Sequence, residues 1–107
     1  MTTMKAVEMH AYGGPEVLKY EDAARPAPAT GEVLVRVHAA AVNPVDWKVR
    51  AGHLRGFLNY SLPLIPGWDL SGVVEATGPG VTDWKQGDAV YARPISGGTA
   101  RTRNTLR

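Results

Sequence analysis

Residues 31–46 read GEVLVRVHAAAVNPVD and decide the fold, because they hold a strand that leads directly into the start of a helix. Apolar valines alternate with Leu34, Arg36 and His38, which is the period of two expected of a β-strand. Arg36 and His38 would share one face, and charged or polar side chains there indicate that this face meets water.

The helix start follows at once. Asn43 stands where an N-cap belongs, Pro44 takes the first helical position, and Asp46 lies three residues after the cap. This arrangement predicts a short helix with a box-like pair at its beginning. Gly52 is suited to end it.

The flanking sequence consists of short strands separated by glycine and proline. Towards the N-terminus, we expect strands at residues 4–9 and 16–20, a turn at 12–15, and an extended connector at 22–30. Towards the C-terminus, we expect an irregular stretch at 53–66, strands at 71–77 and 89–92, and turns at 78–81 and 85–88. The sequence therefore predicts a mainly β fold, a small barrel or sandwich with one short helix.

Composition supports one ordinary globular domain. The chain has 107 residues, of which 44% are hydrophobic and 21% charged. It has no cysteine, which excludes disulfides and thiolate zinc sites. We find neither a secretory signal nor an apolar run long enough to span a membrane, and therefore expect a soluble, cytoplasmic protein without membrane partners.

A series of short segments, in order, resembles one family, the quinone oxidoreductase branch of the medium-chain dehydrogenases and reductases. The matching segments are YGGPEVL at 12–18, GEVLVRV at 31–37, VNPVD at 42–46, PGWDLSG at 66–72, and GPGV with GDAVY at 78–81 and 87–91. Each is short, and their order and spacing make the signal specific. The resemblance covers about residues 4–96.

The resemblance implies a fold and an activity. It implies that the stretch is a GroES-like, partly open β-barrel that packs against a following Rossmann domain, with NADPH between the two. The implied reaction is hydride transfer from NADPH to a quinone or an activated alkene. The fingerprint G-x-G-x-x-G of the Rossmann domain is absent from these 107 residues.

The resemblance also implies a zinc-independent enzyme. Related alcohol dehydrogenases hold catalytic zinc with Cys at the position of Asn43 and His at the position of Trp68. Asn is a poor zinc ligand and Trp is none. His10, His38 and His53 show no ligand-type spacing. We therefore expect no metal, and electrophilic help from hydrogen bonds.

Three residues around the helix start are candidates for cofactor binding. The resemblance places Asn43 beside the nicotinamide and its ribose, where an amide can both donate and accept. Asp46 is a candidate as well, and its alternative is a purely capping role. Lys48 stands where many relatives carry Tyr, and its ammonium could reach a phosphate; the alternative is a solvated helix residue. We identify no catalytic residue.

Trp68 and Asp69 are the candidates for the substrate pocket. They follow Gly67 at the turn that faces the cleft in the resembled fold, where an aromatic ring could wall a quinone site. Trp47 could join them, but ordinary core packing is the better prediction for it. Tyr60 could line the same cleft, although nothing in the sequence places it there.

The C-terminal segment departs from the family pattern. Residues 1–92 carry 8 Lys and Arg and 10 Asp and Glu, whereas residues 93–107 carry four arginines and no acid. Codons can be chosen for residues 99–105 whose shifted frame encodes Gly-Thr-Tyr-Ala-Glu-Tyr, the segment that the family has here. We therefore predict a domain at 1–96 and a disordered basic tail at 97–107, with a frameshift as its hypothesised origin; the gene's nucleotide sequence tests this.

As a portion of an enzyme, the chain is expected to show no turnover without a nucleotide-binding domain. Two other functions stay open. A non-catalytic barrel could self-associate, or pair with an intact homologue, through the apolar face that normally meets the Rossmann domain. Nucleic-acid binding through Arg101, Arg103 and Arg107 is the weakest alternative, because the tail has no interleaved aromatic residues. We therefore expect no nucleic-acid partner.

Overall fold

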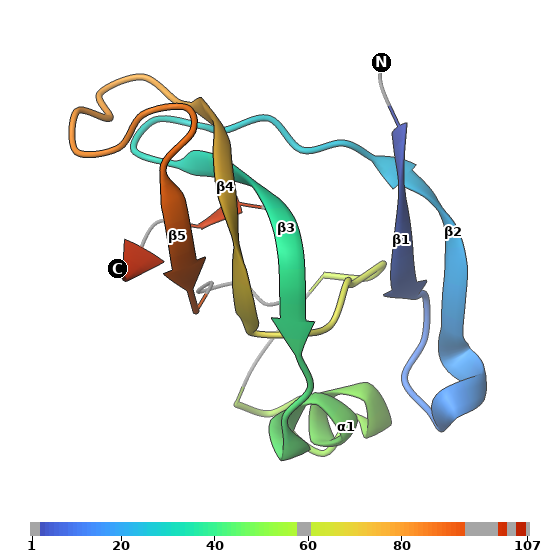
Figure 1. The fold of residues 1–107 in the computed structure, drawn as a ribbon. Coiled ribbons are helices and arrows are strands. Elements are labelled where there is room, and N and C mark those ends of the chain that lie inside the picture. The colour runs from blue at the N-terminus through green and yellow to red at the C-terminus, as the bar shows by residue number, and fades with distance from the viewer. Residues whose placement is uncertain (1–2, 58–60, 94–100, 103–104, 107) are drawn as a thin grey trace.

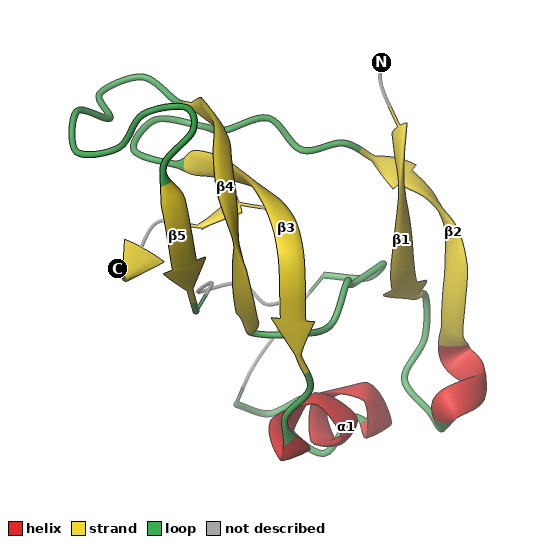
Figure 2. Ribbon diagram, viewed as in Figure 1, coloured by secondary structure: helices red, strands yellow, loops and turns green. Residues whose placement is uncertain are grey.

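The computed structural model describes residues 3–57, 61–93, 101–102 and 105–106. These residues form two antiparallel sheets and one α-helix, which lies beyond one end of the larger sheet (Figures 1 and 2). The elements are β1 (Thr3–Met9), a 3-10 helix (Pro15–Val17), β2 (Leu18–Ala24), β3 (Val33–Ala41), α1 (Pro44–Ala51), β4 (Asp69–Thr77), β5 (Ala89–Ala92), β6 (Arg101–Thr102) and β7 (Thr105–Leu106). The predicted mainly β fold with one short helix is confirmed.

The smaller sheet is the hairpin of β1 and β2. Its register pairs Met9 with Leu18 at the turn end and Thr3 with Ala24 at the other. The first predicted strand is confirmed. The second was placed too early, because Pro15–Val17 form a 3-10 helix whose first turn suits the fixed φ of Pro15. The strand then continues to Ala24, into part of the predicted connector.

The larger sheet has the order β6-β3-β4-β5-β7, with every neighbouring pair antiparallel. The register between β3 and β4 shifts twice, passing over Glu75 at one place and His38 at the other. Each shift adds one residue to one strand and bends it. Between the two shifts, β3 changes from the buried Val33–Val35 to residues that are exposed from Arg36 onward.

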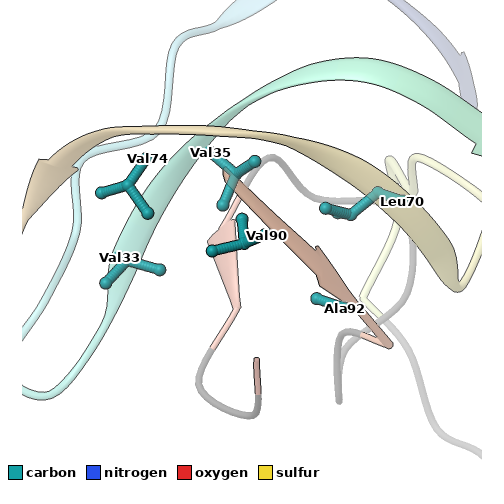
Figure 3. Packing of buried hydrophobic residues seen from close by; sticks show 6 residues of the cluster. All are labelled: Val33, Val35, Leu70, Val74, Val90 and Ala92. Carbon is teal, nitrogen blue, oxygen red and sulfur yellow. The ribbon is translucent and has the colours of Figure 1, made fainter. Parts of the chain in front are cut away.

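One core lies on a single face of this sheet. Figure 3 shows its buried side chains pointing toward one another from β3, β4 and β5. The members are Val33, Val35, Leu70, Val74, Val90 and Ala92. Val81 and Trp84 pack against this cluster from the loop between β4 and β5, so the predicted turns there help to cover the core.

A second core joins the hairpin to the helix. Met9, Val49, Leu64 and Trp68 are buried together. Met9 and Leu64 also exchange two backbone hydrogen bonds of 2.9 Å, which form an isolated bridge between β1 and the segment before β4. This bridge and the apolar contacts around it hold the hairpin in place.

The solvent-facing prediction for β3 is confirmed for Arg36 and His38, which are exposed. Val37, Ala39 and Ala41 are exposed as well, although alternation alone would have buried that face. The second part of β3 thus presents apolar side chains that the described residues do not cover.

The predicted boundary at residues 96 and 97 lies outside the described residues. Two short pieces beyond it pair with the larger sheet, β6 with β3 and β7 with β5. The division into a domain and a tail stays a prediction. Among the described residues, no helix has the length and apolar character needed to cross a lipid bilayer.

Candidate functional site

The start of α1 is built as its sequence predicts. Asn43 is the N-cap with extended backbone, φ −121° and ψ 158°, and Pro44 occupies the first turn. The Asp46 carboxylate accepts a hydrogen bond from the Asn43 backbone N–H at 2.7 Å, closing a capping box. Gly52 ends the helix in the left-handed region at φ 87°.

Asn43 is also tied to the first residue of β4. Its side-chain amide donates a hydrogen bond to the Asp69 carboxylate. The register explains this contact, because Asp69 pairs with Ala41 at the end of β3, two residues before Asn43. The fold therefore brings together Asn43, Asp46 and Asp69, three of the five predicted site residues.

Asp46 is only 9% exposed. One carboxylate oxygen, Oδ2, is used in the capping box, while Oδ1 is buried and has no hydrogen-bond partner among the described residues. A buried acceptor without a donor is costly. The capping role predicted for Asp46 is confirmed.

Lys48 and Trp47 lie on the exposed side of the helix. The Lys48 ammonium is 5.9 Å from the centre of the Trp47 ring, and that ring contacts His53 edge-on, with ring centres 5.4 Å apart. Among the described residues, Lys48 forms no hydrogen bond or ion pair with Asn43 or Asp69.

The two tryptophans differ in burial. Trp47 is 46% exposed, so the prediction of core packing for Trp47 was wrong. The inward side of α1 is occupied by Asp46 and Val49, three positions apart, and Trp47 falls outside that stripe. Trp68 is 8% exposed and packs in the core with Met9. Tyr60 lies outside the described residues.

A pocket of about 500 Å³ lies between the N-terminal strand and the larger sheet. Of the predicted site residues, only Asp69 lines it. Apolar side chains from β3 and β4 form much of its wall, and three cations, Lys5, Arg25 and Arg36, stand around it. Sequence reasoning assigned none of these cations to a site: Arg36 was interpreted only as a solvent-facing residue of the strand, and Lys5 and Arg25 lie outside the quoted motifs.

An ion pair joins two of the residues that line this pocket. Arg25, in the connector after β2, pairs with Glu75 at the first register shift of β4. Both residues line the pocket although they are 50 positions apart in the chain. The shift in β4 leaves Glu75 outside the regular pairing, where its carboxylate meets the arginine.

A second polar cluster lies on the hairpin, formed by Glu8, His10 and Glu21. The imidazole of His10 hydrogen-bonds to the Glu21 carboxylate. This contact, more than any other, raises the pKa of His10 above its ordinary value, with Glu8 adding to the effect. The sequence shows Glu8 and His10 close together at the end of β1, but it does not show that Glu21 of β2 joins them.

A sequence profile described as the alcohol dehydrogenase GroES-like domain matches residues 29–106. Quinone oxidoreductases are among the similar curated proteins: that of Rattus norvegicus is 43% identical and that of Homo sapiens 45% identical, each over 103 residues. In both cases the match covers 91% of this chain and 30% of the relative. The chain thus spans about a third of the length of these relatives.

Solved structures agree with the sequence matches. A quinone oxidoreductase from Escherichia coli complexed with NADPH is similar at a TM-score of 0.79 and 30% identity, over 96% of this chain and 31% of that one. The human synaptic vesicle membrane protein VAT-1 homolog-like protein is similar at a TM-score of 0.84 and 33% identity, over 94% and 32%.

Proposed function

This chain belongs to the family of alcohol dehydrogenase GroES-like domains, and from that premise we propose that it is the N-terminal catalytic-domain portion of an NADPH-dependent quinone oxidoreductase. NADPH, when bound, supplies the hydride, and a quinone or an activated alkene accepts it. The quinone oxidoreductases among its relatives and the NADPH complex of the similar Escherichia coli enzyme support this proposal.

The observation that carries the proposal is the pair of Asn43 and Asp69. Asn43 caps α1 and donates to Asp69, and Asp69 lines the 500 Å³ pocket. A volume of this size suits a small organic molecule. The pair thus connects the residue that we assign to the cofactor with a cavity that we assign to the substrate.

The side chains around the helix start fit the cofactor. The Asn43 amide has two N–H donors, one of which is used on Asp69, and we assign the other to the nicotinamide carboxamide or its ribose. Asp46 is buried on the inward side of α1, and we assign it the role of holding Asn43 at the cofactor site through the hydrogen bond that its Oδ2 accepts from the Asn43 backbone N–H. The exposed Lys48 ammonium can approach a phosphate as a point charge.

The substrate site uses hydrogen bonds and not zinc. Asn43 and Trp68 occupy the positions where the resembled zinc enzymes hold their ligands, and neither side chain is suited to that role. We place the quinone or enone against the apolar wall of the pocket, beside Asp69. Trp68, packed in the core, keeps its neighbour Asp69 in position.

We further propose that the 107 residues do not turn over substrate by themselves. Much of the binding energy for a dinucleotide comes from a Gly-rich loop at a helix N-terminus, and this sequence contains no G-x-G-x-x-G. The residues described above would then supply one wall of the cofactor site.

Titration of the chain with NADPH tests the proposal, with cofactor and tryptophan fluorescence as the signals. We expect weak saturable binding that Lys48→Gln reduces and that Lys85→Gln, a matched exposed lysine in a turn, leaves unchanged. Equal effects of the two variants would remove Lys48 from the cofactor site. Oxidation of NADPH with a quinone by this chain alone would contradict the proposed lack of turnover.

A second candidate function is an interaction module that self-associates or pairs with an intact homologue. The exposed apolar residues of β3 and the following loop support it: Val37 is 40% exposed and Val42 90%. Sedimentation over a range of concentrations tests it. Growth of the particle with concentration supports the module, provided that Val42→Ser abolishes it, and a monomer at all concentrations contradicts self-association.

A further inference from the structure

Three potential metal ligands converge on one face of the hairpin. Glu8 lies near the end of β1 and His10 directly follows its last residue, Met9, while the register places Glu21 opposite Ala6, on the same face as Glu8. One oxygen or nitrogen atom from each of Glu8, His10 and Glu21 lies within 4.8 Å of the other two. None of these residues belongs to the site proposed above.

The burial of Glu8 distinguishes this cluster from a group of charged side chains on the surface. It is 6% exposed, and its Oε2 is buried without a hydrogen-bond partner among the residues that the structure describes. A buried carboxylate without a partner is unfavourable, because it loses its hydration and gains nothing in exchange. One oxygen of this carboxylate lies within 4.8 Å of a ring nitrogen of His10 and a carboxylate oxygen of Glu21, so a cation held by the three would offset the charge of Glu8.

We propose that Glu8, His10 and Glu21 bind a divalent transition-metal ion of the Zn²⁺ type. Imidazole nitrogen and carboxylate oxygen are both ordinary ligands of zinc, at about 2.0–2.2 Å. The nitrogen ligand disfavours Mg²⁺ and Ca²⁺, which prefer oxygen alone. Two carboxylates carry two negative charges that the ion neutralises, and three protein ligands leave a position for water.

The ion has two competitors at this place. The first is the proton on His10, which the Glu21 carboxylate favours; metal binding must release it. The second is Lys19, which pairs with Glu8 in the register of the hairpin and brings an ammonium to the same face. No ion pair between Lys19 and Glu8 is formed among the described residues, so the carboxylate is left for a metal ion.

The test is calorimetric titration of the chelator-treated 107-residue chain with Zn²⁺, alongside visible absorption with Co²⁺ as a spectroscopic substitute. We expect one ion per chain and a rise of the melting temperature that EDTA reverses. His10→Ala and Glu21→Gln should each weaken Zn²⁺ by at least roughly the 10–100-fold that loss of an outer-shell partner costs. His38→Ala, an exposed histidine on β3, is the matched control and should change nothing.

Two further variants separate a ligand from a merely structural residue. Glu8→Gln should leave the metal-free chain as stable or more stable, since it removes a buried charge, and yet weaken Zn²⁺ strongly. Lys19→Met should tighten Zn²⁺ by removing the competing ammonium. The proposal is overturned if wild type binds no Zn²⁺, or if His10→Ala and Glu21→Gln bind as wild type does. It is equally overturned if Lys19→Met destabilises the chain and leaves Zn²⁺ affinity unchanged, because Lys19 is then the partner of Glu8.

Discussion

The side-chain amide of Asn43 donates to the carboxylate of Asp69, and so joins the start of α1 to the start of β4. We predict that Asn43→Asp destabilises the chain, although Asp and Asn are equally good N-caps. Aspartate cannot donate to Asp69 and adds a like charge beside it. The loss of a hydrogen bond to a charged group predicts about 1.5–3 kcal/mol in the free energy of unfolding, measured by urea denaturation.

The reversed pair provides the control. Asp69→Asn in the Asn43→Asp background restores one donor and one carboxylate, with the positions exchanged. We expect it to recover most of the lost stability in a double-mutant cycle. If the double variant is as unstable as the sum of the two single variants, the two side chains do not interact, and Asn43 acts as a helix cap alone.

Gly72 lies where β3 and β4 come close together. A Cβ added there would stand 2.1 Å from the backbone oxygen of Arg36. Because this oxygen belongs to the backbone, the clash can be relieved only if the strand moves. We predict that Gly72→Ala costs at least the roughly 1–3 kcal/mol typical of overpacking, measured as a drop in unfolding free energy. Gly56→Ala is the control, because a Cβ there meets nothing within 4 Å; equal losses in both would refute the steric explanation.

Met9 is the fully buried residue through which the hairpin contacts the second core. We predict that Met9→Ala lowers the unfolding free energy by about 2–5 kcal/mol, as truncation of a buried side chain does. Hydrogen exchange of the β1 and β2 amides should accelerate more than that of β3 and β4, because the hairpin loses its main apolar attachment. Val7→Ala, on the exposed side of β1, should do neither, and uniform acceleration across both sheets would argue against a separately attached hairpin.

Local patterns were enough to predict most of the elements. The alternation around Val35 indicated β3, and Asn43, Asp46 and Gly52 indicated both ends of α1, because these signals act within a few residues. The 3-10 helix at Pro15–Val17 was mistaken for a strand, since two apolar residues beside a turn fit either structure.

Contacts between distant segments could not be predicted in the same way. Asn43 and Asp69 meet because β3 and β4 pair with a particular register, and two shifts in that register have no sequence signature. The gathering of Glu8, His10 and Glu21 likewise depends on the hairpin register. A one-residue slip would move Glu21 to the other face and dissolve the cluster.

The prediction that Trp47 packs in the core was wrong, and the fluorescence of Trp47 and Trp68 offers a direct measurement of their burial. Trp47 is exposed on α1 and Trp68 is buried against Met9. We predict that acrylamide quenches the fluorescence of Trp68→Phe more efficiently than that of Trp47→Phe, because the first variant keeps the exposed ring and the second keeps the buried one; Trp84 is present in both. Truncation should follow the same order, with a cost of about 3–5 kcal/mol for Trp68→Ala and a much smaller one for Trp47→Ala. If quenching and stability both follow the reverse order, Trp47 lies in the core, as the sequence alone had suggested. The orientation of α1, on which the proposed role of Lys48 depends, would then be wrong.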